Sequence, residues 1–203
     1  RKRIHAYQCR QSCRTESDLA IQYRSSMDVE ISMTHRLVLA LAVAGMGCAT
    51  LAAQSSNPLS EEARHAYEGV KKNILGAADA MPDADYSFKA TPVVRSFAQI
   101  VEHVVPAQTH TCAAFNGETK TASISATSPK AEIVAALKES FADCDKAYGS
   151  LTDATAAQMV KSGRGERTRL GLLVGNTTHD VEQYSAMAVY MRLKGLVPPS
   201  SQR

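Results

Sequence analysis

The sequence predicts an all-α protein, a four-helix bundle with a crossover between its second and third helices. Four segments carry hydrophobic residues at helical spacing, and no segment alternates convincingly with a period of two. The second and third segments are separated by a 12-residue link, 117–128. Extended chain covers about 3.3 Å per residue, so the link can reach roughly 40 Å, whereas a helix of about 24 residues is about 36 Å long. The link can therefore make these two helices parallel, although a folded-back loop is also allowed.

Charge is distributed unevenly along the chain. Seven of the 23 basic and four of the 20 acidic residues lie in residues 1–53, which leaves residues 54–203 with 16 of each. Such a balance gives no support for nucleic-acid binding by the bundle. We predict three parts: a non-native or disordered leader over 1–32, a signal peptide over 33–53, and the helical bundle over 54–203.

The predicted signal peptide begins at Met33, has Arg36 as its positive lead and continues into an apolar stretch over 37–44. This stretch is too short for a membrane span, which needs about 20 apolar residues. We favour cleavage after Ala53; a lipoprotein cut before Cys48 and an uncleaved anchor are the alternatives. We therefore expect an exported protein, periplasmic or secreted, with no stable membrane span after cleavage.

The first helix is predicted over about 60–75, with Ser60 as its N-cap and Gly76 as its end. Residues 77–90 contain turn formers without a sustained period. They are expected to form a packed connection, with Tyr86 and Phe88 in contact with the bundle.

The second helix is predicted to begin with Thr91 as cap and Pro92 as its first residue, and to end at Asn116 and Gly117. Pro106 lies inside it. Because the proline ring clashes with the preceding turn, we expect a kink beside His103.

The third helix is predicted over about 129–150, where apolar residues form the clearest stripe in the chain. Residues 152–166 are small and polar, with a helical turn expected around 156–160. The last helix is predicted over about 167–194 and ends at Gly195.

Cys112 and Cys144 test the topology. If the second and third helices are parallel, these cysteines come within about 8 Å of each other along the bundle axis. An exported domain favours a disulfide between them, provided that their Cα atoms come within about 7 Å. The alternative is a pair of buried thiols.

Four histidines lie in residues 54–203. His65 is predicted to be solvated, and His110 has no obvious partner. His103 and His179 each lie about a dozen residues into a long helix, so both are expected near mid-bundle. Gln183 is four residues after His179 and could bind an ion with both histidines, although an amide oxygen is a poor ligand for transition metals. By spacing alone, hydrogen bonding in the core is the commoner role of such histidines.

Four strings in the chain resemble the DinB/YfiT-like family, especially an exported bacterial branch. They are MPDADYSF at 81–88, TPVVRSF at 91–97 with His103 after it, NTTHDVEQY at 176–184, and YMRLKGLVPPSS at 190–201. The resemblance covers roughly residues 58–201. It implies a four-helix bundle with the same crossover.

The resemblance also implies a divalent metal, often nickel or zinc, held by one histidine of the second helix and a His-x3-His pair of the fourth. His103 and His179 match two of these positions, and Gln183 stands where the family generally has histidine. Characterised relatives include metal-dependent transferases and isomerases that use small thiols. We therefore expect metal-dependent thiol transferase-like chemistry on a small-molecule ligand, with Glu182 as a candidate base. The alternative is a non-catalytic periplasmic binding or stress-associated domain that has lost its metal. Some relatives form pairs, so a homodimer is a further expectation.

Overall fold

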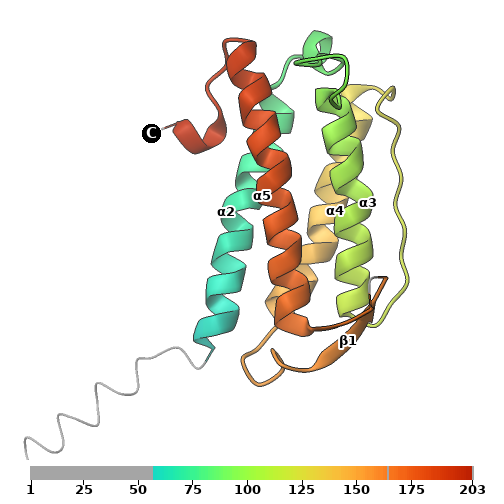
Figure 1. Cartoon of the computed structure of the whole chain (residues 1–203), viewed down its shortest axis with the longest axis vertical. Helices are drawn as coiled ribbons and strands as arrows, with labels where there is room; N and C mark the ends of the chain where they lie inside the picture. Colours follow the sequence, from blue (N-terminus) through green and yellow to red (C-terminus); the bar gives the residue numbers. More distant parts are fainter. Residues whose placement is uncertain (1–56, 164, 203) are drawn as a thin grey trace, which may run out of the picture. The chain divides into compact units, whose positions relative to one another are not determined.

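The computed structural model describes residues 57–163 and 165–202, and helices and strands carry the labels of Figure 1. The predicted leader and signal peptide lie outside the described residues. The helices are α2 (Pro58–Ala80), α3 (Phe97–Phe115), α4 (Lys130–Ser150) and α5 (Arg169–Leu193), with a hairpin of β1 (Met159–Ser162) and β2 (Gly165–Thr168) and two short 3-10 helices, η2 (Asp83–Asp85) and η3 (Pro199–Ser201). The all-α four-helix prediction is confirmed.

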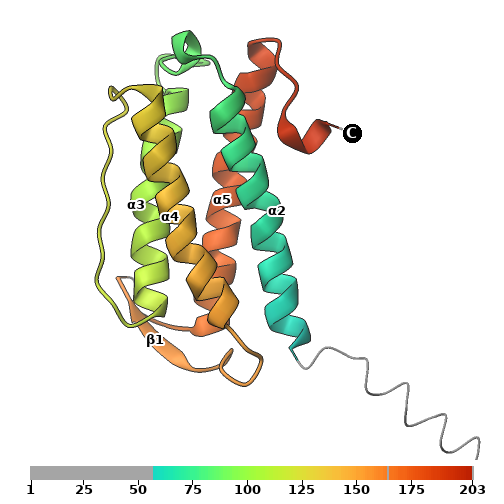
Figure 2. The same ribbon diagram turned by 180° about the vertical axis from the view of Figure 1, so that it is seen from behind.

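The link between α3 and α4 runs along the outside of the bundle from one end to the other (Figures 1 and 2). The helices α3 and α4 are therefore parallel, and α2 and α5 run in the opposite direction. The parallel pair α3 and α4 packs against the pair α2 and α5: α3 contacts α5, and α4 contacts α2. The two helices of each pair also contact each other. Of the two arrangements that the length of the link allows, the structure has the crossover.

Helix α2 is longer at both ends than predicted. Ser60 lies inside the helix, not at its N-cap, and its backbone N–H and hydroxyl both donate to the carboxylate of Asp153. That remote carboxylate satisfies donors that the first turn leaves unpaired. Gly76 does not end the helix, which continues to Ala80; instead it lets Pro199 approach closely.

Helix α3 begins five residues later than the predicted start at Pro92. Ser96 is its N-cap and forms a capping box with Gln99, in which each side chain accepts from the backbone N–H of the other. The preceding connection is packed against the bundle as expected, with Tyr86 donating to the carbonyl of Ala78 and Phe88 making an edge contact with Tyr190. The helix continues through Pro106 and ends before Gly117, whose φ of 75° suits glycine.

The segment after α4 differs most from the prediction. Residues 159–168 form an antiparallel hairpin, with Met159 opposite Thr168 and Ser162 opposite Gly165, where a helical turn was expected near 156–160. These strands are only four residues long and largely exposed, so their alternation is too brief to be visible in the sequence. The hairpin lies at the same end of the bundle as the start of α2 (Figure 1).

Helix α5 begins at Arg169, with the hydroxyl of Thr168 accepting from the N–H of Gly171. It ends before Gly195, whose φ of 75° suits the predicted stop. The chain then folds back, and the hydroxyl of Tyr184 donates to Ser200. The C-terminal segment is thereby held to the helix that carries His179.

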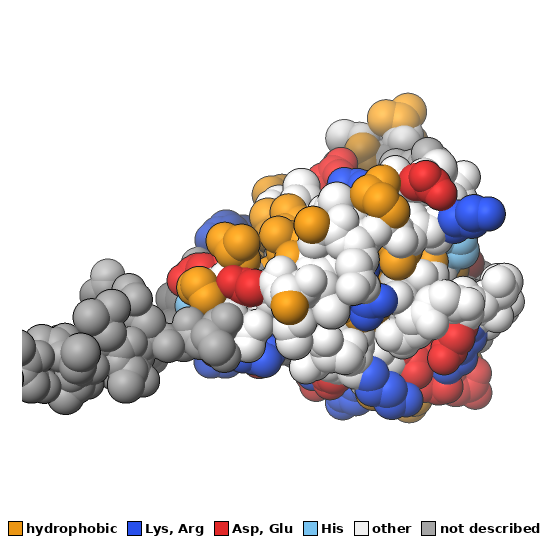
Figure 3. Space-filling view, turned by 90° about the horizontal axis from the view of Figure 1, so that it is seen from below, with side chains coloured by type: hydrophobic (Ala, Val, Ile, Leu, Met, Phe, Trp, Pro, Cys, Tyr) orange, Lys and Arg blue, Asp and Glu red, His pale blue; other side chains and the backbone are white. Residues whose placement is uncertain are grey.

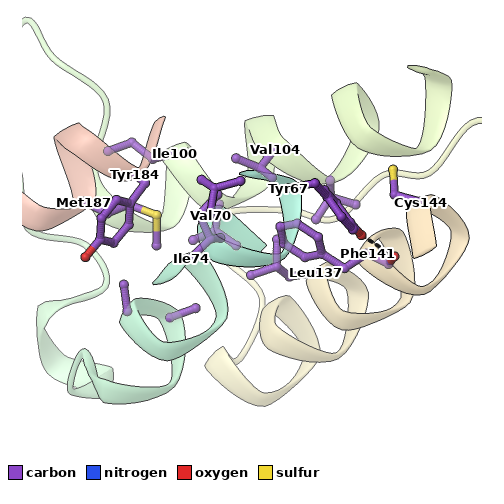
Figure 4. Close-up of a cluster of buried hydrophobic side chains, with 14 of the residues drawn as sticks. Tyr67, Val70, Ile74, Ile100, Val104, Leu137, Phe141, Cys144, Tyr184 and Met187 are labelled. Atoms are coloured by element: carbon purple, nitrogen blue, oxygen red, sulfur yellow. Dashed lines mark hydrogen bonds between the residues drawn. The ribbon is translucent and has the colours of Figure 1, made fainter. Parts of the chain in front are cut away.

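The core is aliphatic and aromatic and extends through all four helices. The rings of Tyr67 and Tyr148 stack at 3.8 Å between centroids, and the hydroxyl of Tyr67 donates to the carbonyl of Phe141. Figure 4 shows Val70, Ile74 and Leu137 in one cluster with Tyr67 and other buried side chains from α2 to α5. The core lies between the helices and fixes their relative positions.

Among the described residues, no helix combines the length and apolar character needed to cross a membrane. On the end that bears the hairpin, acidic and basic side chains lie near one another (Figure 3). This mixture agrees with the equal numbers of the two charges in residues 54–203.

Candidate functional site

His103 of α3 and His179 of α5 meet inside the bundle. Their Nε2 atoms are 3.0 Å apart and their ring planes are inclined by 61°. Both side chains are half-buried. The structure thus brings together the two histidines that the sequence places near mid-bundle.

The separation of the two nitrogens fits shared binding of one ion. Two imidazole nitrogens at about 2.0–2.1 Å from one metal lie about 2.9 Å apart at a right angle and about 3.4 Å apart at the tetrahedral angle. The observed 3.0 Å falls within this interval. Without a metal, the same contact is a hydrogen bond in which one ring donates and the other accepts.

The third position of the predicted metal site is occupied by a neutral side chain. Gln183 follows His179 by one turn of α5 and is buried, with 8% of its surface exposed. Glu182, the candidate base, is exposed beside it. Within residues 57–163 and 165–202, no three histidine, cysteine, aspartate or glutamate side chains form a group that could hold a metal. The described residues therefore bring two imidazoles together, and Gln183 offers an amide one helical turn from His179.

Asp180 lies behind the histidine pair and is fully buried. Its Oδ1 is 3.5 Å from Nδ1 of His179. Burial raises the pKa of the Asp180 carboxyl above its usual value, and His179 opposes the shift. Neither Oδ1 of Asp180 nor Nδ1 of His179 has a hydrogen-bond partner among the described residues.

His103 is favoured in its neutral form. Burial lowers the pKa of its imidazole, and the charges of Arg95 and His179 act in the same direction, whereas Glu182 acts against them. Only the neutral ring offers a lone pair to a metal. The environment of His103 therefore suits a ligand better than a permanent cation.

A buried polar network lies next to the pair. Asn176 of α5 donates to Oε1 of Gln108 at 2.6 Å, and Tyr148 of α4 donates to the carbonyl of Leu173 at 2.7 Å and contacts the hydroxyl of Thr177. Burial raises the pKa of Tyr148 to about 12. The network ties α3, α4 and α5 together at the level of the histidines.

A pocket of about 440 Å³ opens beside the histidines, between α3, α5 and the hairpin. His103 and His179 line one part of it, and His110 lines another together with Gly163 of the hairpin. His110 is exposed there and remains apart from the metal candidates, and His65 is exposed on α2 as predicted. Small molecules can reach the pair through this pocket.

The structure places Cys112 and Cys144 side by side, with their Cα atoms 5.1 Å apart. This separation lies within the limit of about 7 Å that disulfide geometry places on the two Cα atoms. The cysteine pair lies between α3 and α4, nine residues beyond His103 on α3. It lies next to Gln108, whose Oε1 is 3.0 Å from Sγ of Cys144.

The sequence did not assign Asp180 or Asn176 a role, although both belong to the string that carries the family resemblance. Their burial was the missing information, because a charged residue beside a histidine on a helix usually faces solvent. Arg167 was also missed. It lines the pocket from the hairpin, an element that the sequence did not predict.

Comparison with known proteins identifies the relatives of this chain. A search of curated proteins finds no match. Among solved structures, a DinB-like protein from Bacillus cereus ATCC 10987 matches with a TM-score of 0.55 and 19% identity, over 68% of this chain and 95% of that one. At this identity the likeness concerns the fold. The family model of the DinB superfamily matches residues 66–186, more than half of the sequence and inclusive of both histidines, so the chain belongs to the DinB superfamily.

Proposed function

We propose that the bundle binds one divalent transition-metal ion between His103 and His179. The observation that carries this proposal is the 3.0 Å separation of their Nε2 atoms, on facing helices and beside an open pocket. Imidazole nitrogen suits nickel and zinc, the two ions that the family resemblance favours.

Gln183 is the proposed third ligand, through its amide oxygen. It lies on the same face of α5 as His179 and is buried close to it. An amide carries no charge and binds transition metals weakly, so the affinity should be lower than that of a site with three histidines. Asp180 lies on the other side of the His179 ring, with its Oδ1 3.5 Å from Nδ1.

The reaction proposed for the loaded site is thiol transfer to an electrophilic small molecule. A divalent ion supplies Lewis acidity and lowers the pKa of a bound thiol. His103 and His179 would hold the ion, and the open pocket beside them would admit the small-molecule ligand. Glu182 is the candidate base, because it is exposed beside Gln183 and its charge reaches His103.

A specific observation favours a second function, a non-catalytic binding domain. No third histidine or carboxylate completes the donor set among the described residues. A bundle of this kind would keep the pocket and the hydrogen-bonded histidine pair but hold no metal. It would act as an exported binding or stress-associated protein.

We also propose that the domain works outside the cytosol. The support is the positively led apolar segment over 33–53 and the cysteine pair, which suits an oxidising compartment. N-terminal sequencing of protein secreted from an expression host would identify the cleavage site. A chain that keeps residues 33–53 and stays in the cytosol would contradict export.

Metal analysis separates the two functions. Protein purified without a histidine tag is treated with a chelator, reloaded with nickel or zinc, and analysed for bound metal and affinity. We expect about one ion per chain in the wild type, at least tenfold weaker binding in His103→Ala, and tighter binding in Gln183→His. The matched control is His65→Ala, which removes an exposed histidine of α2 and should change nothing.

Each outcome has a distinct meaning. If neither the wild type nor Gln183→His holds a stoichiometric ion, the metal proposal fails. If only the variant does, the natural protein has lost its site and the binding function stands. Equal loss of binding in His65→Ala would show that the ion is held elsewhere.

A further inference from the structure

The pocket beside the histidine pair contains a fixed positive charge that the metal site does not use. Arg167, in strand β2, lines this pocket together with His103, His110 and His179. The arginine is exposed, so its charge is accessible to a ligand. The ion pairs recorded for residues 57–163 and 165–202 do not include Arg167.

Glycines on α5 determine where the guanidinium lies. A Cβ atom at Gly175 would be 2.8 Å from Nη1 of Arg167, and one at Gly171 would be 4.0 Å from Nη2. A side chain at position 175 would therefore displace the guanidinium. Because Gly171, Gly175 and His179 are spaced by four residues, they share one face of the helix, and Arg167 lies flat against it.

Arg167 is the charged side chain among the residues that line the pocket, which also include three histidines. None of these lining residues is an aspartate or glutamate. Hydroxyl and amide groups of Thr111, Ser162 and Asn176 supply further polar surface. A cationic, partly enclosed pocket of this size attracts small anions more than neutral or cationic ligands.

We propose that this pocket binds a small molecule through an oxyanion, a carboxylate or a phosphate, with Arg167 as its anchor. The guanidinium fork matches the two oxygens of such a group. His179 lies one helical turn beyond Gly175, about 6 Å along the axis. A ligand anchored at Arg167 thus needs only a few bonds to place its other end at the histidine pair.

Anion binding at Arg167 requires no metal, but its role in catalysis rests on the proposed function. The anchor would orient an anionic substrate with its reactive end toward the histidines. Gly175 is the matching specificity determinant, because it leaves room for the guanidinium. The substrate class is therefore small organic anions.

The test measures anion binding to the chelator-treated full chain. Succinate and inorganic phosphate are titrated at constant ionic strength, and the histidine Cε1–H proton resonances are followed by NMR after assignment with single histidine substitutions. We expect saturable shifts at His110 or His179, and at least tenfold weaker binding in Arg167→Gln. The response to the two probes tells whether a carboxylate or a phosphate is preferred.

Two further variants distinguish recognition from folding and general charge. Gly175→Ala favours the helix but displaces the guanidinium, so it should weaken anion binding with helical circular dichroism unchanged. Arg64→Gln removes one positive charge from α2, outside the pocket, and should bind like the wild type. Equal affinity in Arg167→Gln and the wild type, or shifts that do not saturate, would overturn the proposal.

Metal binding to Arg167→Gln is measured in parallel and should be unchanged. If anions bind but metal does not, only the proposed metal function fails. If metal binds and Arg167→Gln has no effect on anions, only the anion site fails.

Discussion

Asn176 on α5 donates a hydrogen bond of 2.6 Å to the side-chain oxygen of Gln108 on α3. Both residues are almost fully buried, with 4% and 0% of their surfaces exposed. Gln108 follows His103 on α3, and Asn176 precedes His179 on α5. Since the two helices are antiparallel, this bond fixes the register that brings the two histidines together.

The first prediction concerns this bond. Gln108→Leu and Asn176→Leu should each lower the free energy of unfolding by about 1–3 kcal/mol, because the remaining amide loses its buried partner. Each should also weaken metal binding by loosening the histidine pair. A double-mutant cycle from urea unfolding should give a coupling of about 0.5–3 kcal/mol. Ser185→Ala, on the exposed side of α5, is the control; additive losses would show that the two side chains do not act together.

Much of this site was predictable because helix length and position determine it. The predicted helices place His103 and His179 each about a dozen residues from a helix start, so both are expected near the same level. In the structure His103 is the seventh residue of α3 and His179 the eleventh of α5, and their rings meet. The length of the link allowed the crossover, although it also allowed a folded-back loop, and the two cysteines were expected at similar levels in the parallel arrangement. These features depend on distances along the chain, which the sequence gives directly.

The rest depends on contacts between distant residues. The start of α3 is at Ser96, not Thr91, because the first N–H groups of the helix pair with the carbonyls of Phe88 and Tyr86 in the packed connection. The hairpin that carries Arg167 has short, exposed strands with little periodicity. Thr91 and Ser96 are both good N-cap residues, and the sequence alone does not show which of them makes the tertiary contacts. The same holds for the short strands of the hairpin.

The second prediction concerns high pH. Tyr148 has its pKa raised by burial to about 12 in the folded protein, against 10.0 in the unfolded chain. The folded state therefore holds this proton more tightly, and its stabilisation is fully present below pH 10 and is lost as pH rises toward 12. Urea unfolding between pH 8 and 12 should show a falling midpoint, and Tyr148→Phe should flatten part of the fall. A urea midpoint that does not change with pH in the wild type would contradict a stabilising role for the Tyr148 proton.

The third prediction concerns the disulfide. Cys112 and Cys144 are 32 residues apart, and closure of a loop of that size stabilises a fold by roughly 3–4 kcal/mol in the chain-entropy model. Reduction should therefore lower the urea midpoint markedly. Mass analysis of a non-reduced digest should find the two cysteines in one cross-linked peptide. If thiol blocking before reduction labels both cysteines, the bond is not formed and the pair are buried thiols.

The fourth prediction compares two glycines of α2. A Cβ at Gly69 would meet no atom within 4 Å, so Gly69→Ala should stabilise the protein by about 0.5–1 kcal/mol through helix propensity. A Cβ at Gly76 would lie 3.0 Å from Cγ of Pro199, so Gly76→Ala should gain less or lose stability as the C-terminal segment is pushed away. Thermal unfolding of both variants measures the difference, and the sign at Gly76 reports how firmly η3 is held. Truncation after Val197 removes Pro199 and should restore the full gain at Gly76. Equal stabilisation at the two positions in the full chain would show that the segment after α5 yields freely.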